Sequence, residues 1–210
     1  MSRPLVKICG ITTLEDARSA VRFGADFVGL NFWPESPRHI TEDVACGIVE
    51  EVRGETVIVG VFVNEDAPVV VELADRVGLD LLQFHGDEDG DYLAPFGPRG
   101  IKVFRHREGF DAASLDEYPG VWGFLFDAYQ PDLAGGTGKA WPYERLGNLE
   151  AVKPYLVAGG IGPDNVVRAL RASGAAGVDV CSGVESSPGV KSAELIQRLF
   201  EEVRDGETQT

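Results

Sequence analysis

The hydrophobic positions along this chain fall into short continuous runs rather than into an alternating pattern. Eight such runs predict buried strands, at residues 5–9, 26–32, 56–63, 79–84, 100–104, 121–128, 155–160 and 176–180. Continuous apolar strands are typical of a parallel sheet whose two faces are both covered. The pattern therefore predicts a parallel sheet that other elements of the chain enclose.

Amphipathic stretches between these runs predict the covering helices, at residues 12–21, 41–52, 67–77, 112–117, 143–146, 163–171 and 192–203. Thr12 and Glu15 form a capping-box pattern at the start of the first helix, and Gly24 is typical of its end. Thr41 is expected to cap the second helix, and Pro163 to start the helix at 163–171.

Strand and helix alternate about eight times, which predicts an α/β fold of the closed (β/α)₈ TIM barrel type. An open, doubly wound sheet is the alternative, and the absence of a G-x-G-x-x-G motif after the first strand disfavours it. With 210 residues, 44% of them hydrophobic, the chain is long enough for a single barrel domain at 1–205, followed by a polar C-terminal tail at 206–210.

Composition and charge limit the kinds of molecule that this protein is expected to bind. The formal net charge of −15 disfavours nucleic acids and anionic membranes, because both need a positive surface. An anionic small molecule is compatible with this charge if backbone N–H groups, a helix start or a chosen Arg or Lys hold it. The chain has neither a membrane-spanning apolar stretch nor a signal-peptide core, and its three widely spaced cysteines cannot form a disulfide framework. We therefore expect a cytoplasmic protein with a small-molecule ligand.

Polar residues and glycines stand at the carboxyl ends of the predicted strands, where barrels of this kind carry their chemistry. Cys9 ends the first strand and Asp127 the sixth. A thiol with a lowered pKa is a competent base, and a carboxyl group in a partly apolar pocket is a competent acid. Cys9 and Asp127 are therefore the candidate base and acid. The alternative interpretations are a small buried hydrophobe for Cys9 and a turn or helix cap for Asp127.

Other polar residues at this rim are weaker candidates. Arg38, in the loop after the second strand, could bind a substrate carboxylate, and His85 could take part in catalysis or orient a neighbour. Lys7 is expected to point toward the helix layer, and so to leave the pKa of Cys9 unaffected. Cys181 is expected to line the pocket. A zinc site built from Cys9, Cys181, Asp179 and His85 is disfavoured because no close-spaced pair of ligands is present, so we predict no metal.

Two glycine-bearing loops follow the seventh and eighth strands. They contain Gly159 and Gly160 in AGGIGPDN, and Ser182 and Gly183 in VCSGVES. Glycines let a backbone approach a ligand closely, and loops in these two positions are the usual phosphate site of a TIM barrel. The pattern predicts phosphate binding, with two tight turns as the alternative. The GGTGK run at 135–139 lacks the P-loop frame and is interpreted as a mobile loop over the site.

These motifs, in this order, resemble the phosphoribosylanthranilate isomerase family of tryptophan biosynthesis. The resemblance is carried by KICGIT at 7–12, GLNFWPESPRHI at 29–40, QFHG at 83–86, FDA at 126–128, GGTGK at 135–139, AGGI at 158–161 and VDVCSGVE at 178–185. It implies an eight-stranded βα barrel without a cofactor. It also implies conversion of N-(5'-phosphoribosyl)anthranilate to 1-(2-carboxyphenylamino)-1-deoxyribulose 5-phosphate, an Amadori rearrangement. The chain departs from the family pattern at Trp141-Pro142-Tyr143, at Phe84 and at Cys181, and serine is more usual at this last position.

The resemblance also implies roles for individual residues. Cys9 matches the family's general base and Asp127 its general acid. The residues expected to bind the substrate are Arg38, Gln83, His85 and Asp179, and those expected to bind its phosphate are Gly159, Gly160, Ser182 and Gly183. The oligomeric state is left open, with a homodimer as one alternative. Two other functions stay in view: another phosphosugar isomerase or metal-dependent epimerase, and a barrel that binds a phosphoribosyl ligand without catalysis. The presence of Cys9 and Asp127 disfavours the latter.

Overall fold

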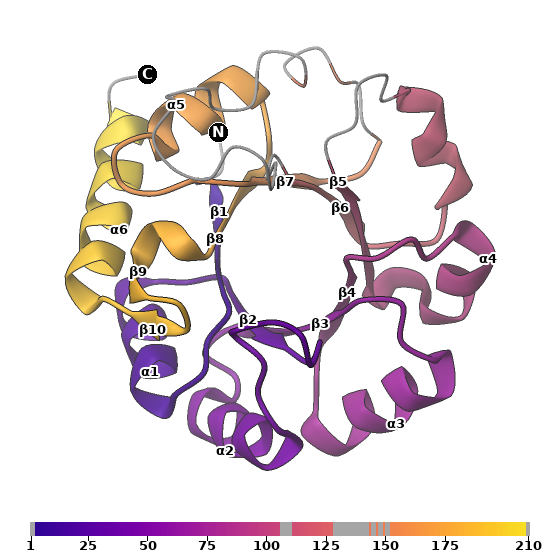
Figure 1. Cartoon of the computed structure of the whole chain (residues 1–210). Helices are drawn as coiled ribbons and strands as arrows, with labels where there is room; N and C mark the ends of the chain where they lie inside the picture. Colours follow the sequence, from indigo (N-terminus) through magenta and orange to yellow (C-terminus); the bar gives the residue numbers. More distant parts are fainter. Residues whose placement is uncertain are drawn as a thin grey trace.

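The barrel wall is a closed sheet of eight parallel strands in chain order, with β8 beside β1 (Figure 1). The computed structural model describes residues 3–105, 111–127, 143, 146, 149 and 152–208. The strands are β1 Leu5–Cys9, β2 Phe27–Asn31, β3 Val57–Phe62, β4 Leu81–Phe84, β5 Gly100–Arg105, β6 Gly123–Asp127, β7 Tyr155–Ala158 and β8 Gly177–Val180. The closed barrel and its eight predicted strands are confirmed.

The helices lie outside the wall and cover it (Figure 1). They are α1 Leu14–Phe23, α2 Glu42–Val52, α3 Ala67–Val77, α4 Gly90–Leu93, α5 Val166–Ser173 and α6 Ala193–Thr208, with the 3₁₀ helices η1 Ala94–Arg99, η2 Ala112–Glu117 and η5 Ser182–Val184. Two short strands, β9 Glu185–Ser187 and β10 Val190–Lys191, form a hairpin between η5 and α6. In the part of the chain that the structure describes, no helix combines the length and the apolar character needed to cross a membrane.

Several helix limits differ from the predictions. The N-cap of α1 is Thr13, whose side chain accepts from the Asp16 N–H, because the Thr12 hydroxyl donates to the Gly189 carbonyl of the hairpin turn at 2.5 Å. Helix α5 starts after Asn165 rather than at Pro163, and α6 runs to Thr208 rather than ending at 203. The helical turns at 90–99 were not predicted. Most of the predicted helix at 143–146, and the Gly-rich loop that precedes it, lie outside the described residues.

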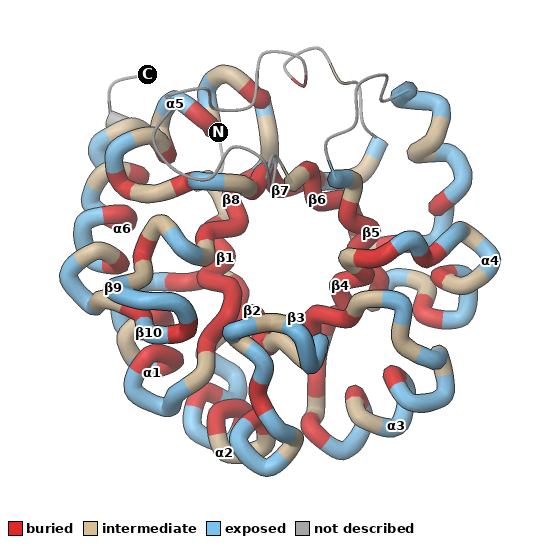
Figure 2. Tube along the Cα trace, in the orientation of Figure 1, coloured by how far each residue is buried: buried red, intermediate tan, exposed pale blue. Residues whose placement is uncertain are grey.

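Two apolar cores explain why the strands read as continuous hydrophobic runs. Alternate residues of each strand face the helices or the barrel interior. The outer core lies between wall and helices and includes Val28 and Leu30 of β2. The inner core fills the lumen and consists of Phe27, Val59, Leu81, Ile101, Val103, Leu125, Leu156 and Ala158. The wall is accordingly buried along nearly its whole length, and exposed residues lie on the helices and loops (Figure 2).

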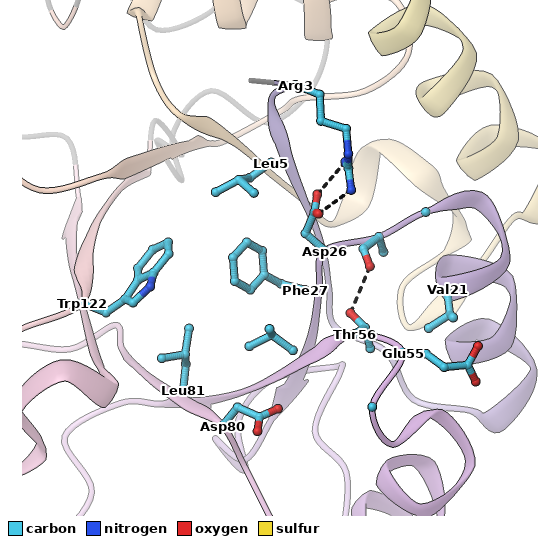
Figure 3. A pocket seen from close by; sticks show the side chains of 14 residues that line it. Arg3, Leu5, Val21, Asp26, Phe27, Glu55, Thr56, Asp80, Leu81 and Trp122 are labelled. Atoms are coloured by element: carbon cyan, nitrogen blue, oxygen red, sulfur yellow. Dashed lines mark hydrogen bonds and ion pairs between the residues drawn. The ribbon is translucent and has the colours of Figure 1, made fainter. Parts of the chain in front are cut away.

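The end of the barrel where the strands begin is hollowed, but its polar groups are mostly paired (Figure 3). Arg3 donates to both carboxylate oxygens of Asp26 at 2.6 and 2.9 Å, and the Thr56 hydroxyl donates to the Ala25 carbonyl at 3.0 Å. Phe27 and Trp122 meet edge to face, with ring centroids 5.6 Å apart. These contacts tie the start of the wall together, and we assign this end a structural role.

The inner core predicts a specific cost for truncating a lumen residue. Leu156 is fully buried in this core, so Leu156→Ala should lower the free energy of unfolding by about 2–5 kcal/mol through lost burial and the cavity left behind. Val69, on α3, is 46% exposed, and Val69→Ala is the matched control, with a change within about 0.5 kcal/mol. Urea unfolding measures both. Equal effects of the two substitutions would contradict a packed lumen.

Candidate active site

A cavity of about 430 Å³ opens at the carboxyl ends of the strands. Nine of the ten residues that the sequence predicts for the site line it: Cys9, Arg38, Gln83, His85, Asp127, Gly159, Gly160, Asp179 and Ser182. Cys181 lines it too, as expected. Gly183 does not line it, because it packs behind the lining against the loop after β7, where a Cβ atom would overlap the Ile161 carbonyl oxygen. The topology therefore brings together groups that lie far apart in the sequence.

Lys7 lies inside the barrel, so the prediction that it points toward the helix layer is wrong. Residues two apart on a strand share a face, and Lys7 therefore faces the lumen together with Cys9. Its side chain is fully buried, and its Nζ donates to Asp179 Oδ1 at 3.0 Å. A Cβ atom placed on Gly29 would lie 3.1 Å from Lys7 Nζ and 2.9 Å from Cys9 Sγ. The missing side chain of Gly29 thus leaves room for an ammonium group beside the thiol.

The charges of this buried group depend on each other. Burial alone would lower the pKa of Lys7, but Asp179 and Cys9 raise it above its ordinary value, so the ammonium group stays charged. Burial raises the pKa of Asp179, Lys7 opposes this shift and Cys9 adds to it, and the resulting pKa is about 7. One cation, Lys7, therefore compensates two acidic groups, Asp179 and Cys9. The carboxyl group of Asp179 is more easily protonated than an ordinary aspartate.

Cys9 meets a second thiol across the junction of β1 and β8. The hydrogen bond from Cys181 lowers the pKa of Cys9; burial opposes this, and the positive charges of Lys7 and Lys191 lower it further. The hydrogen bond to Cys9, together with burial, raises the pKa of Cys181. The Cys181 sulfur also lies 3.8 Å from Glu185 Oε1, a second anionic acceptor that favours its protonated form. Cys9 is thus the thiolate of the pair and Cys181 the thiol.

Arg38 is held in place by an acid that the sequence analysis did not select. Its guanidinium group donates from Nε and Nη2 to the two carboxylate oxygens of Glu185, at 2.8 and 2.6 Å. The buried ammonium group of Lys191 donates to the same carboxylate at 2.8 Å. Burial alone would raise the pKa of Glu185, but these hydrogen bonds lower it to about 2. Glu185 therefore stays ionised and fixes the arginine at the edge of the cavity.

A short polar chain leads to Asp127 on the other side of the lumen. Gln83 Nε2 lies 3.2 Å from His85 Nδ1, and His85 Nε2 lies 3.2 Å from Asp127 Oδ2. An amide that donates to Nδ1 leaves the hydrogen of a neutral imidazole on Nε2, facing the carboxyl group. This arrangement orients the Asp127 side chain toward the centre of the cavity rim.

The two glycine loops present unused donors. Gly159 and Gly160 have positive φ angles of 96° and 67°, a backbone conformation that favours glycine. Their carbonyl oxygens accept from the Tyr143 hydroxyl and from the Asn165 side chain. Within the described residues, the backbone N–H groups of Gly160, Ser182 and Gly183 donate to no other protein group. Unpaired N–H groups beside a cavity are suited to binding an anion.

The residues present do not suit a metal ion. The described residues contain no group of three His, Cys, Asp or Glu side chains arranged as metal ligands.

Sequence reasoning missed three charged residues of this site: Lys7, Glu185 and Lys191. Lys7 could have been found from its spacing of two from Cys9 on one strand. Lys191 and Glu185 belong to the hairpin β9–β10, which the turn residues Pro188-Gly189 could have signalled.

Known proteins resemble this chain over nearly its whole length. The family model for "N-(5'phosphoribosyl)anthranilate (PRA) isomerase" matches residues 6–202. The N-(5'-phosphoribosyl)anthranilate isomerases of Citrifermentans bemidjiense and Nitrosomonas europaea are 42% and 41% identical to this chain, with 95–96% of this chain and 96% of each relative covered.

Solved structures of phosphoribosyl anthranilate isomerases also superpose on this chain. The phosphoribosyl anthranilate isomerase of Thermus thermophilus superposes with a TM-score of 0.84 at 36% identity, and the match covers 96% of this chain and 98% of that one. A phosphoribosyl anthranilate isomerase in complex with reduced 1-(o-carboxyphenylamino)-1-deoxyribulose 5-phosphate superposes with a TM-score of 0.79 at 31% identity, covering 96% of this chain and 99% of that one. These matches extend over nearly the whole chain, and they show that it belongs to the N-(5'-phosphoribosyl)anthranilate isomerase family.

Proposed function

We propose that this chain isomerises N-(5'-phosphoribosyl)anthranilate to 1-(2-carboxyphenylamino)-1-deoxyribulose 5-phosphate, a step of tryptophan biosynthesis. One observation carries the proposal: a thiol on β1 and a carboxyl group on β6 border one cavity whose third side is a pair of loops with unused N–H donors. The relatives named for this activity, and the relative solved with the reduced product, support the choice of substrate.

The reaction needs one acid and one base. Asp127 donates a proton to the ring oxygen of the ribose, the bond from that oxygen to C1 breaks, and the anthranilate nitrogen forms an iminium with C1. The Cys9 thiolate then removes the proton from C2, which gives an enolamine that tautomerises to the ketone. His85 holds Asp127 by the contact at 3.2 Å and is a positioning residue. Neither step requires a metal or a redox group.

The rest of the cavity can hold the two ends of the substrate. The phosphate accepts hydrogen bonds from the N–H groups of Gly160 and Ser182, with Gly159 providing the turn and Gly183 packing behind the lining. The guanidinium group of Arg38, fixed by Glu185, has N–H groups left for the anthranilate carboxylate. Gln83 and Asp179 line the cavity between these ends. A metal-dependent epimerase, the alternative from another reaction class, fits less well because the described residues lack a suitable ligand cluster.

Replacing the acid or the base tests the assignment. We expect Cys9→Ser and Asp127→Asn each to lower kcat by about 100-fold or more, because each removes a proton-transfer group while keeping the side-chain volume. The loss of anthranilate fluorescence on turnover measures the rate. Cys46→Ser, on α2 outside the cavity, is the matched control and should retain the parent rate. Near-parent rates for both site variants would rule out this mechanism.

The pH dependence tests the role of Lys7. Cys9 works as a base only when ionised, and the positive charge of Lys7 favours that form, so its removal raises the pKa of Cys9. In Lys7→Gln, the acid limb of the kcat/KM–pH profile should therefore move to higher pH. The rate of Cys9 alkylation by iodoacetamide should move in the same direction.

A lysine outside the cavity provides the control for this measurement. Lys153 donates to the Val121 carbonyl at 2.8 Å, before the start of β6, and Lys153→Gln should leave the profile in place. An acid limb that stays at the parent pH in a folded Lys7→Gln protein would contradict the electrostatic role.

Two further properties belong to this proposal. We propose a cytoplasmic location, which the three free cysteines support. We also propose a homodimer; monomers generated from the dimeric isomerase of Thermotoga maritima superpose with a TM-score of 0.85 at 31% identity over 96% of this chain and 99% of that one. Sedimentation equilibrium should give twice the monomer mass of 22.6 kDa, and a monomer mass across the concentration range would overturn the dimer.

A further inference from the structure

Two cysteines stand where neighbouring strands end at the mouth of the cavity: Cys9 is the last residue of β1, and Cys181 directly follows β8. Strands β1 and β8 pair in parallel, and the pairing includes Lys7 with Asp179 and Ile8 with Val180. Cys9 and Cys181 are the next residues in this register. Neighbouring strands lie about 4.8 Å apart, within the range of roughly 4.4–6.8 Å between Cα atoms that a disulfide spans. Both side chains line the same cavity, and each thiol shifts the pKa of the other.

The two sulfur atoms differ in chemical character. Cys9 faces the ammonium group of Lys7 inside the barrel, which favours a nucleophilic thiolate. Cys181 keeps its proton because it faces the anions of Cys9 and Glu185. Lys191 Nζ lies 3.7 Å from the Cys181 sulfur and donates to the Cys181 carbonyl at 3.3 Å. A thiolate that forms on Cys181 during a reaction would therefore have a cation beside it.

Small reagents can reach both atoms from the cavity. Cys9 and Cys181 both line the 430 Å³ space. Cys46, the third cysteine, lies on α2 outside this cavity, with its sulfur near the Arg76 carbonyl. The chain therefore holds one facing pair of cysteines, and that pair includes the proposed base.

We propose that Cys9 and Cys181 form a redox-active dithiol, and that peroxides convert it to a disulfide that reversibly inactivates the enzyme. Only the expected loss of isomerase activity rests on the proposed function; the formation of the disulfide does not. In the first step the Cys9 thiolate attacks one oxygen of hydrogen peroxide, the O–O bond breaks, and hydroxide leaves, giving a sulfenic acid on Cys9. The Cys181 sulfur then attacks the Cys9 sulfur, the S–O bond breaks, and the hydroxide that leaves takes the Cys181 proton as water. Two thiols and one peroxide thus give one disulfide and two waters.

The modification removes the base from the reaction, because a sulfur in a disulfide cannot accept the C2 proton. It also protects that base, because a disulfide is reduced by thiols whereas sulfinic and sulfonic acids generally are not. A serine at position 181 could still donate a hydrogen bond to the Cys9 thiolate but could not resolve a sulfenic acid. The sulfur of Cys181 therefore has a chemical consequence that a hydroxyl group lacks.

The experiment uses the full chain with Cys46→Ser, which leaves two cysteines, and compares it with the same protein carrying Cys181→Ser in addition. Each protein is treated with hydrogen peroxide, then split into portions with and without dithiothreitol, and compared with its own untreated sample. Intact mass, thiols open to alkylation and isomerase rate are measured in every portion. The Cys46→Ser protein should lose two hydrogens in mass, lose both reactive thiols, and lose activity by about 100-fold or more, with dithiothreitol restoring all three.

The serine variant separates disulfide formation from simple oxidation of Cys9. With Cys181→Ser added, peroxide should add oxygen atoms instead of removing hydrogens, and dithiothreitol should restore activity only in part. A Cys46→Ser protein that gains oxygen and forms no link between the peptides of Cys9 and Cys181 would overturn the proposal. Mass and thiol counts do not depend on turnover, so an untreated protein without isomerase activity would overturn the proposed function and leave this test intact.

Discussion

The closure of the barrel between β1 and β8 is the constraint on which the site depends, and the buried Lys7–Asp179 pair is the contact at its centre. The pair joins residues 172 positions apart at 3.0 Å, with both side chains almost fully buried. Removing one partner of such a pair costs about 3–5 kcal/mol, because the other charge is left without compensation in the interior. The wall therefore closes with a cation in its lumen, and the same cation lies beside Cys9. Closure and activation of the base share one interaction.

The sequence predicts the fold best where turn residues mark the ends of elements. Helix α3 has the predicted limits, because Pro68 lies in its first turn and Gly78, with a φ of 81°, ends it. The turns at 90–99 were missed because Gly97 and Pro98 interrupt the helical pattern, and the structure indeed has a kink at Gly97. The start of α5 was misplaced because the Asn165 side chain holds residues 160–165 in a turn before the helix, through bonds to the Gly162 N–H and the Gly160 carbonyl that no local pattern reveals.

Some features of the candidate site could likewise be predicted from the sequence, and others could not. The positions of Cys9 and Asp127 could be predicted because parallel strands of one barrel end at one rim, whatever their distance in sequence. The partner of Arg38 could not, since Glu185 lies 147 residues away and meets it only when β8 closes on β1. The orientation of Lys7 could have been predicted, because its spacing of two from Cys9 decides which face of the strand it occupies. Pairings across the junction need the register of the closed sheet, which a single sequence does not contain.

The register of that junction also explains how an acidic protein can accept an anionic substrate. The net charge of −15 is a property of the whole chain and does not describe the charges that surround the cavity. Its cations Lys7, Arg38 and Lys191 are each bonded to a carboxylate, with Arg38 and Lys191 sharing that of Glu185. The phosphate would instead meet backbone N–H groups, which carry a fixed partial charge and keep it at any pH. A site built from paired ions and main-chain donors thus depends little on the protein's overall charge.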